Sequence, residues 1–557
     1  MIINDATTPL ERPTVWELLE EHGGILFSLD EGAPISIDDP RAEARPVDVH
    51  LHSGRVRGGD LFAALPGHTV EGVEYVPDAI RRGARVILAP ADRPVALLRE
   101  RCTASGVAPE GAIAWLHPRA RAVAGAIADD VHGRPAASLM LAGVTGTNGK
   151  TSVAHLTSQI LERARYRPGV LGTAGHVLRG ARGPVHLQAT HTTPDVTEVV
   201  RLLARHRAHG GRSALMEMSS HALQQERVHG LSLQVGAFTN LTREHLDYHG
   251  SMEAYAAAKA RLWECVVPGG IAVVFGHDGA ARAMRRAAAA RGLRVVTVDI
   301  DRRADLTARD VHFDERGASF RLCGMGLAER HVHLPLSGMH NVENALVACA
   351  IARAFGCPST PLVEGLENAV APPGRLEPIA VPEPVLGERF DVYVDYAHSP
   401  DALERVLRAL RADLERRAER EDRSVGRLIC VFGCGGDRDR GKRGPMGRAA
   451  GIHADVSIVT SDNPRTEDPA AIADSVVAGI DETAGRRIVE LDRRRAIECA
   501  LGMARPNDLV LIAGKGHENT QTIGDLALPF DDRVVATEAL AALANDEPLA
   551  AVGGGAR

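Results

Sequence analysis

The hydrophobic positions of the chain fall into short runs, separated by longer stretches in which apolar and polar residues alternate with a helical period. A short apolar run bounded by turn residues is typical of a buried strand, and the longer mixed stretches are typical of helices. In the first segment, Arg85–Pro90 predicts a strand and Ala120–Asp130 predicts a helix. Residues 1–136 are therefore predicted to form a small α/β domain.

A second domain is predicted from residue 137 onwards, where the apolar run Leu139–Val144 follows a stretch with glycine and proline. Further apolar runs alternate with helical stretches, at Ser213–Met218, Val235–Thr239, Ile271–Phe275 and Val295–Val298. This alternation predicts a doubly wound, parallel α/β sheet in residues 137–372. The turn Ala371–Gly374 marks the next boundary.

Residues 373–557 are predicted to form a third, Rossmann-like α/β domain. Its strands are expected at Phe390–Val394, Leu428–Phe432, Val456–Thr460 and Asp508–Ala513. A chain of 557 residues is too long for a single hydrophobic core, so three α/β domains also suit its length.

The composition is that of a globular protein, with 45% hydrophobic and 25% charged residues. A formal net charge of −7 argues against broad nucleic-acid binding. No apolar stretch is long enough to span a membrane, no signal peptide is visible, and the eight scattered cysteines favour a reducing compartment. We therefore expect a cytoplasmic monomer with no nucleic-acid or membrane partner.

Lysine is nearly absent from the chain. Of 65 basic residues, only Lys150, Lys259, Lys442 and Lys515 are lysine, and the others are arginine. A composition bias explains the depletion but not the positions that resist it. Unlike arginine, lysine offers a compact ammonium and an amine that can lose its proton and react. Lysine chemistry is therefore expected to matter where lysine is kept.

The segment Gly143–Thr151 reads Gly-Val-Thr-Gly-Thr-Asn-Gly-Lys-Thr and lies between a predicted strand and the helical stretch Ser152–Ala164. Such a loop binds phosphates, because glycines let backbone N–H groups approach them. Lys150 would supply charge near the β- and γ-phosphates, and the Thr151 hydroxyl can ligate Mg²⁺. The strict pattern has glycine where this chain has Val144, so a chance glycine-rich turn is the alternative.

Further segments resemble the motifs of the Mur ligase family, in the family's order. The loop form Thr-Gly-Thr-Asn-Gly-Lys-Thr is seen in this family and in folylpolyglutamate synthetases. The other matching segments are Glu217–His221, Asn240–His249, Tyr255–Lys259, His340–Asn344, Gly374–Arg375 and Asp395–Pro400. Six ordered matches are not expected by chance, so the chain resembles an ATP-dependent amide-bond ligase of this family.

The resemblance implies a catalytic and metal-binding group of Lys150, Glu217, His245 and Lys259, with Thr151 as a further Mg²⁺ ligand. Lys259 would react with carbon dioxide to form a carbamate, an anionic ligand for a second Mg²⁺ that arginine cannot provide. Burial would favour this reaction by lowering the pKa of the amine. Taken singly, a glutamate or histidine is more often a surface or hydrogen-bonded residue, and Lys259 alone would fit a solvated helix.

For ATP, the resemblance implies contacts from the phosphate loop, from Asn344 in the central domain, and from residues of the third domain. The expected ATP-binding residues are Gly146, Thr147, Asn148, Gly149, Lys150, Thr151, Ser152, Asn344, Arg375 and Asp395. Asn344 would lie near the adenine, Asp395 at the ribose hydroxyls and Arg375 against the phosphates. A site divided between domains implies domain closure, which would exclude water from a reactive acyl phosphate.

The segment Ser53–Phe62, followed by His68, resembles the UDP-binding segment of family members that add the third residue of the peptidoglycan precursor. Those members usually have Asp-Ser-Arg where this chain has His52, Ser53 and Gly54, which leaves the uridine contacts open. The residues expected to bind the UDP-linked dipeptide are Ser53, His68, Thr192, Thr193, Ser219, Gln225 and Arg227.

Three motifs at the ends of predicted strands, Gly433–Arg443, Asp462–Arg465 and Gly514–Glu518, resemble the amino-acid site of the same ligases. The expected contacts are Arg438, Asp462, Asn463, Pro464, Arg465, Gly514 and Glu518. The form Asp-Asn-Pro-Arg is associated with meso-diaminopimelate, whose extra carboxylate a guanidinium can bind with two hydrogen bonds. Taken alone, the same four residues fit an ordinary Asn-Pro turn.

The resemblance thus implies a ligase that uses Mg²⁺ and ATP to join diaminopimelate to UDP-N-acetylmuramoyl-L-alanyl-D-glutamate. The same reaction with L-lysine or another amino acid stays open. A folylpolyglutamate synthetase would not need the UDP-type segment, and a simple P-loop ATPase would not need the motifs of the third domain. The alternative from another class is a non-catalytic sensor of muramyl peptides, against which Lys150, Glu217, His245 and Lys259 argue.

Overall fold

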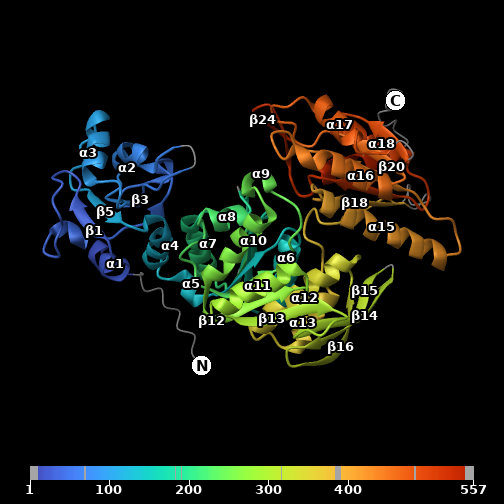
Figure 1. The fold of residues 1–557 in the computed structure, drawn as a ribbon, viewed down its shortest axis with the longest axis horizontal. Coiled ribbons are helices and arrows are strands. Elements are labelled where there is room, and N and C mark those ends of the chain that lie inside the picture. Colours follow the sequence, from blue (N-terminus) through green and yellow to red (C-terminus); the bar gives the residue numbers. More distant parts are fainter. Residues whose placement is uncertain are drawn as a thin grey trace.

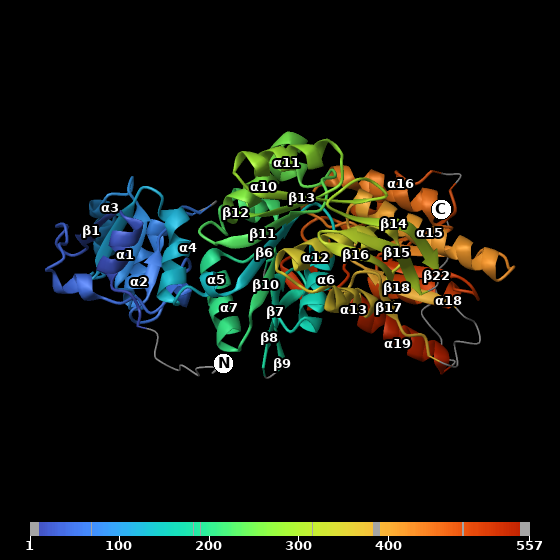
Figure 2. The ribbon, with the colours of Figure 1, turned by 90° about the horizontal axis from the view of Figure 1, so that it is seen from below.

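A computed structural model describes residues 11–67, 70–181, 183–189, 191–314, 316–382, 390–481 and 484–545. The chain forms three α/β domains that follow one another in sequence order (Figure 1). In both views the first domain lies to one side of the central domain, away from the third (Figure 2). His68, one of the expected substrate contacts, lies outside the described residues.

The first domain is built on a five-stranded sheet of order β1-β5-β4-β3-β2. Its strands are β1 (Ile25–Ser28), β2 (Val49–His50), β3 (Leu61–Ala63), β4 (Val86–Pro90) and β5 (Ile113–His117). Only β1 runs antiparallel to its neighbour. The helices are α1 (Val15–His22), α2 (Val76–Arg81), α3 (Val95–Ala104) and α4 (Ala120–Val131). The predicted strand and helix of this segment are confirmed to within one residue at each end.

The central domain contains an eleven-stranded sheet of order β16-β15-β14-β13-β12-β11-β6-β10-β7-β8-β9. Its middle strands, which are parallel, are β6 (Met140–Thr145), β7 (Pro168–Gly172), β10 (Ser213–Glu217), β11 (Leu233–Phe238), β12 (Val266–Phe275), β13 (Arg294–Ile300) and β14 (Leu306–Asp314). The edge strands β8 (Gly175–Gly180), β9 (Gly183–Leu187), β15 (Gly317–Gly324) and β16 (Leu327–Leu334) are antiparallel. The sheet is therefore mixed, whereas the sequence predicted a parallel one.

Helices cover the central sheet and place its functional loops. They are α5 (Pro135–Ser138), α6 (Lys150–Arg163), α7 (Val196–Ala208), α8 (Ser220–Gln224), α9 (Leu246–His249), α10 (Met252–Ala260), α11 (Gly279–Ala290), α12 (Met339–Ala354) and α13 (Ser359–Glu367). Helix α6 packs against α12 and α13 over a core that includes Val153, Leu156 and Leu346. Because α6 is fixed by this core, its amino end is a rigid platform at the edge of the sheet.

The third domain has a six-stranded sheet of order β17-β18-β22-β19-β20-β21 and a separate hairpin. The strands are β17 (Glu377–Ile379), β18 (Asp391–Asp395), β19 (Leu428–Phe432), β20 (Val456–Val459), β21 (Arg486–Val489) and β22 (Leu509–Ala513), and the hairpin is β23 (Thr520–Ile523) with β24 (Leu526–Pro529). The helices are α15 (Pro400–Arg420), α16 (Arg443–His453), α17 (Pro469–Val477), α18 (Arg493–Met503) and α19 (Asp532–Ala544). All the expected strands are present, and β17 is an antiparallel edge.

A buried ion pair joins α18 to α19 beside this sheet. The guanidinium of Arg493 donates to both carboxylate oxygens of Asp532, at 2.8 and 2.7 Å, and neither side chain is exposed to solvent. Arg493 also donates to the carbonyl of Ala513 at the end of β22. Removing one partner of a buried pair leaves an uncompensated charge, so the pair constrains the packing of both helices.

We expect Asp532→Ala to lower the free energy of unfolding by about 3–5 kcal/mol, because the Arg493 guanidinium would remain buried without its counter-charge. Glu538→Ala is the matched control. It breaks the exposed pair that Glu538 forms with Arg494 between the same two helices, and should cost less than about 1 kcal/mol. Chemical denaturation of the full chain measures both, and equal losses would contradict the assignment.

Candidate active site

The loop between β6 and α6 has a backbone shape that only glycine adopts easily at two of its positions. Gly146 and Gly149 have φ values of 153° and 89°. A Cβ atom at Gly146 would lie 1.9 Å from Oγ1 of Thr239, and one at Gly149 would lie 2.3 Å from Oδ1 of Asn344. Both glycines are thus required by conformation and by space, which distinguishes this loop from a chance turn.

Lys150 begins α6, two residues earlier than the predicted start of the helix. Its Nζ donates to the carbonyls of Gly146 and Thr147, at 2.8 and 2.9 Å, so the side chain curls back over the loop. Burial lowers the pKa of Lys150, against the opposing charges of Glu244 and Glu217. The ammonium and the amino end of α6 together form an anion-binding position.

Glu217 lies at the end of β10, beside β6, and its side chain is buried. Its Oε2 accepts hydrogen bonds from the hydroxyls of Thr151 and Thr173, at 2.9 and 3.0 Å, and its Oε1 accepts from the backbone N–H of Thr173 at 2.9 Å. A Cβ at Gly172 would lie 2.0 Å from Oε1 of Glu217, so the absence of a side chain at Gly172 leaves the space that the carboxylate fills. The structure thus brings together two of the expected metal ligands, Thr151 and Glu217.

Lys259 lies on α10 with only 1% of its surface exposed. Its Nζ lies 4.3 Å from the centre of the Tyr255 ring, whose hydroxyl is 3.3 Å from Oγ1 of Thr147. Burial and, after it, the neighbouring Lys150 hold the pKa of Lys259 well below its usual value, while Glu244 opposes this shift. A buried amine with a depressed pKa is available as a nucleophile.

His245 is the N-cap residue of α9 and belongs to a cluster of rings with His221, Tyr248, His249 and Tyr255. Its ring centre lies 4.8 Å from that of His221. Burial lowers the pKa of His245 to about 4, with Glu244 opposing. A neutral imidazole is the form that ligates metal ions.

Glu244 lies within the motif Asn240–His249 but is not among the residues that the sequence predicted for the site. Its carboxylate lies 3.9 Å from Nε2 of His245 and 3.4 Å from Nε2 of His398, which belongs to the third domain. A hydrogen bond from His398 and the charges of His398, His245 and Lys150 hold the pKa of Glu244 well below its usual value, against burial. Its position immediately before His245 was the only sequence signal.

Polar contacts join the third domain to this site. Arg375 donates to the Thr151 hydroxyl at 3.3 Å, and Nε2 of His517 lies 3.1 Å from the carbonyl of Thr173. Asn148 donates to Asp401 at 2.9 Å. Two domains therefore meet over the phosphate loop and over Glu217.

A pocket at this meeting of domains is lined by residues expected to bind ATP: Asn148, Gly149, Ser152, Asn344, Arg375 and Asp395. His340, Glu343, Leu376 and Arg405 are among its other lining residues. Asp395 accepts backbone hydrogen bonds from Leu376 and Ala397, each at 2.7 Å, and burial raises its pKa. The pocket thus lies between the phosphate loop and the third domain.

The residues expected to bind the UDP-linked dipeptide divide between two places. Thr193 donates to the carbonyl of Glu217, and Ser219 N donates to Thr193, while Thr192 contacts the Thr173 hydroxyl. Gln225 donates to Tyr248, and Arg227 lies 3.9 Å from Asp195. Ser53 lies in the first domain, in a turn that approaches α7 through the pairs His52 with Asp195 and Arg55 with Glu198.

The residues expected to bind the amino acid lie together at the ends of β19, β20 and β22. Asn463 donates to Glu518 at 3.0 Å, and Arg465 donates to the carbonyl of Gly436 at 2.7 Å. Arg465 and Arg438 both lie beside Gly435. The backbone of Arg465 is itself held by hairpin β23–β24, through hydrogen bonds with Thr522 and Gly524.

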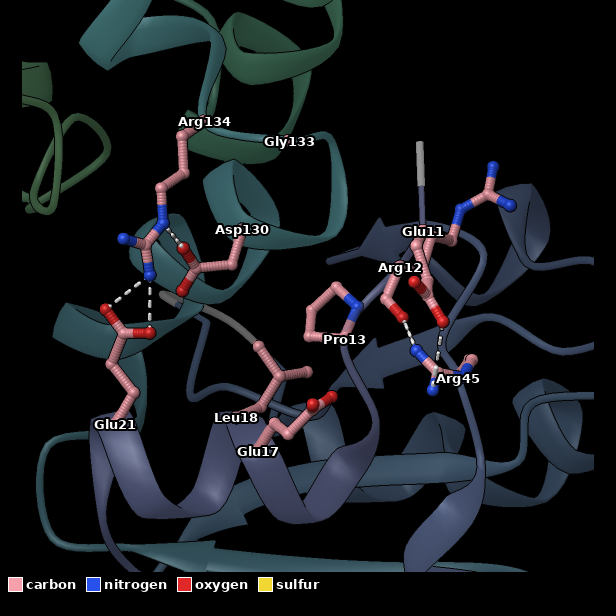
Figure 3. Close-up of a pocket in the computed structure, with 10 residues that line it drawn as sticks. All are labelled: Glu11, Arg12, Pro13, Glu17, Leu18, Glu21, Arg45, Asp130, Gly133 and Arg134. Atoms are coloured by element: carbon pink, nitrogen blue, oxygen red, sulfur yellow. Dashed lines mark hydrogen bonds and ion pairs between the residues drawn. The ribbon is translucent and has the colours of Figure 1, made fainter. Parts of the chain in front are cut away.

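A second pocket, of about 440 Å³, lies in the first domain (Figure 3). It is lined by Glu21 and Asp130, which with His22 form the only group of three His, Cys, Asp or Glu side chains, among the described residues, whose ligand atoms all lie within 4.8 Å of one another. Arg134 forms ion pairs with both carboxylates, and Nε2 of His22 lies 2.6 Å from Asp130, so both carboxylates already have partners. We assign no role to this group. Among the described residues, no helix is both long and apolar enough to cross a lipid bilayer.

The three α/β domains, with a phosphate loop where the central and third domains meet, define a nucleotide-binding protein whose site is shared between domains. Comparison with known families narrows this class. The Mur ligase middle domain matches residues 144–352, the glutamate ligase domain of Mur ligases matches residues 374–516, and the catalytic domain of the Mur ligase family matches residues 49–133. The chain belongs to the Mur ligase family.

Individual relatives agree with this assignment. The UDP-N-acetylmuramoyl-L-alanyl-D-glutamate–2,6-diaminopimelate ligase of Synechococcus elongatus is 40% identical over 522 residues, which are 93% of this chain and 99% of the relative. A solved structure of a ligase of that name is 33% identical, with a TM-score of 0.62 over 93% of this chain and 99% of the other. A MurF ligase from Thermotoga maritima in complex with ADP shares the fold at 16% identity, with a TM-score of 0.58 over 90% and 97% of the two chains.

Proposed function

We propose that the protein is an ATP-dependent ligase that joins meso-diaminopimelate to UDP-N-acetylmuramoyl-L-alanyl-D-glutamate in peptidoglycan precursor synthesis. The observation that carries the proposal is the similarity to ligases of that name over nearly the whole of both chains. The geometry supports it, because the phosphate loop, the Glu217 site and the amino-acid motifs lie along one junction between two domains. We place the domain boundaries at residues 136 and 372.

The proposed reaction has two steps. The γ-carboxylate of the D-glutamate attacks the γ-phosphorus of ATP, which forms an acyl phosphate and releases ADP. The amine of diaminopimelate then attacks the acyl carbon, which forms the amide bond and releases phosphate and a proton. Lys150, Arg375 and the backbone N–H groups of the loop would bind the charge of the transferring phosphoryl group. Individual donors of this kind typically contribute about 3 kcal/mol to such a transition state.

The donor set near the loop suits Mg²⁺, which prefers oxygen ligands. Thr151 and Glu217 would hold one ion with His245, and Lys259 as a carbamate would hold a second. Bound Mg²⁺ would neutralise phosphate charge and so favour the transfer. The depressed pKa of Lys259 supports the carbamate, because carbon dioxide reacts only with the neutral amine. Burial beside Tyr255 would protect the product from water.

For the amino acid, we propose that Arg465 and Arg438 bind carboxylate and that Glu518 binds ammonium. The Arg465 guanidinium and the Cγ of Arg438 both lie beside Gly435. Two arginines in this loop region suit the carboxylates of diaminopimelate better than the single carboxylate of lysine. We further propose a cytoplasmic, monomeric enzyme. The described cysteines are free thiols, as expected in a reducing compartment.

Phosphate release by the purified enzyme tests the proposed function. With ATP, Mg²⁺ and the UDP-linked dipeptide, release should depend on added meso-diaminopimelate. L-Lysine and other amino acids should support it poorly. Release with L-lysine alone would favour a lysine-adding ligase, and binding of the dipeptide without any release would favour a sensor.

Lys259→Ala should lose nearly all activity and regain part of it when a short carboxylic acid is added, because a free carboxylate can occupy the place of the carbamate. Phosphate release measured with and without added acetate or formate checks this. Arg494→Ala, on the exposed face of α18, controls for loss of a basic side chain elsewhere, and should keep its activity and respond to neither acid. Full activity of Lys259→Ala without the acid would refute the carbamate role.

Arg465→Ala should raise KM for diaminopimelate by about tenfold or more and leave KM for ATP nearly unchanged, because a charge-assisted hydrogen bond contributes about 1.5–3 kcal/mol. Steady-state kinetics with each substrate varied in turn measure both constants. Arg494→Ala, on the exposed face of α18, is the control. A similar rise for both substrates would argue against recognition by Arg465.

A further inference from the structure

Lys515 is one of the four lysines of the chain, and the function proposed above assigns it no role. It follows β22, and its side chain has no exposed surface. Its Nζ donates to the carbonyl of Thr520 at 2.6 Å, to Oε2 of Glu518 at 3.2 Å and to Oδ1 of Asn463 at 3.3 Å. A carboxylate oxygen of Asp462 lies 3.9 Å away. Burying an ammonium group costs free energy of desolvation, which its partners offset only when they are placed at hydrogen-bonding distance.

The partners of Lys515 come from three segments of the third domain. Asp462 and Asn463 follow β20, Glu518 follows β22, and Thr520 opens β23. Asn463 closes the network, because its Nδ2 donates to the same Oε2 of Glu518, and its Oδ1 also accepts from the backbone N–H of Thr522. One ammonium thus connects the loop that carries Arg465, the loop that carries Glu518 and the hairpin behind them.

The size of the site explains why arginine does not replace this lysine. Three acceptors surround one small ammonium, which a planar guanidinium cannot match in the same volume. The buried guanidinium of Arg493 already occupies neighbouring space, where it donates to the carbonyls of Ser461 and Ala513. Position 515 therefore requires a compact cation.

The network fixes the orientation of the Glu518 carboxylate. Both hydrogen bonds that the structure shows to its carboxylate, from Asn463 and Lys515, go to Oε2. The side chain as a whole is 35% exposed. A carboxylate held by one oxygen presents the other in a fixed direction, as recognition of a ligand ammonium requires.

We propose that Lys515 is a positioning residue that fixes Glu518 and Asn463, so that Oε1 of Glu518 receives the ammonium of the incoming amino acid. This inference rests on the proposed function and deepens it. Lys515 does not touch the substrate and acts through Glu518. It therefore sets the affinity for the amino acid and leaves the sites for ATP and the UDP-linked dipeptide unchanged.

The test compares Lys515→Met and Lys515→Gln with the wild-type enzyme. Methionine keeps most of the side-chain volume without any charge, and glutamine can still donate to Thr520 and Asn463, which protects the fold. Both variants should raise KM for diaminopimelate by at least about tenfold, while KM for ATP and for the dipeptide stays within about twofold. Nucleotide binding measured by calorimetry verifies that each variant is folded. Arg494→Met is the matched control on the surface of the same domain.

A double variant separates positioning from general stabilisation. In a Glu518→Gln background, adding Lys515→Gln should raise KM for diaminopimelate by less than about twofold, because the group through which Lys515 acts is already altered. A full additional effect, or equal rises of KM for all three substrates, would overturn the inference and leave the proposed function standing. A wild-type enzyme that shows no amino-acid-dependent phosphate release would overturn both.

Discussion

The active site depends on the balance of charge between the amines of Lys150 and Lys259 and the carboxylates near them. Burial lowers the pKa of both lysines, and Lys150 lowers the pKa of Lys259 further. Glu244 opposes the shift of both, and Glu217 opposes that of Lys150. Burial disfavours a charged amine unless a counter-charge lies close to it, so the carboxylates must be held near the lysines by a rigid backbone. The core beneath α6 and the close contacts of Gly146 and Gly149 provide that rigidity.

The domain arrangement follows from the same constraint. Each sheet delivers its functional residues at the carboxyl ends of parallel strands, as open α/β sheets generally do. In the central domain these are the loop after β6 and Glu217 after β10, and in the third they are the motifs after β19, β20 and β22. Facing the two edges toward each other brings the phosphate loop and the proposed amino-acid site to one junction, which neither domain could form alone.

Much of this was predictable from the sequence. Continuous apolar runs located strand β19 at Leu428–Phe432 without error, because a strand buried on both faces has no polar interruptions. Strands β8–β9 and β15–β16 were not predicted, because edge strands such as β9 are largely exposed and lack an apolar run. Thr173 was missed since its contact with Glu217 uses a backbone N–H as well as a hydroxyl, and nothing in its neighbourhood marks it. The roles of the predicted site residues stay predictions, although the structure gathers most of them.

Polar contacts such as Asn148 with Asp401 and His517 with Thr173 join the central and third domains. Among the described residues, the buried apolar clusters of the two domains are separate. Each such hydrogen bond contributes only about 0.5–1.5 kcal/mol net, because water replaces it when the surfaces separate. The free energy needed to separate the central domain from the third domain is consequently small. An enzyme that must release a large nucleotide-linked product after every cycle benefits from a domain interface that opens and closes easily.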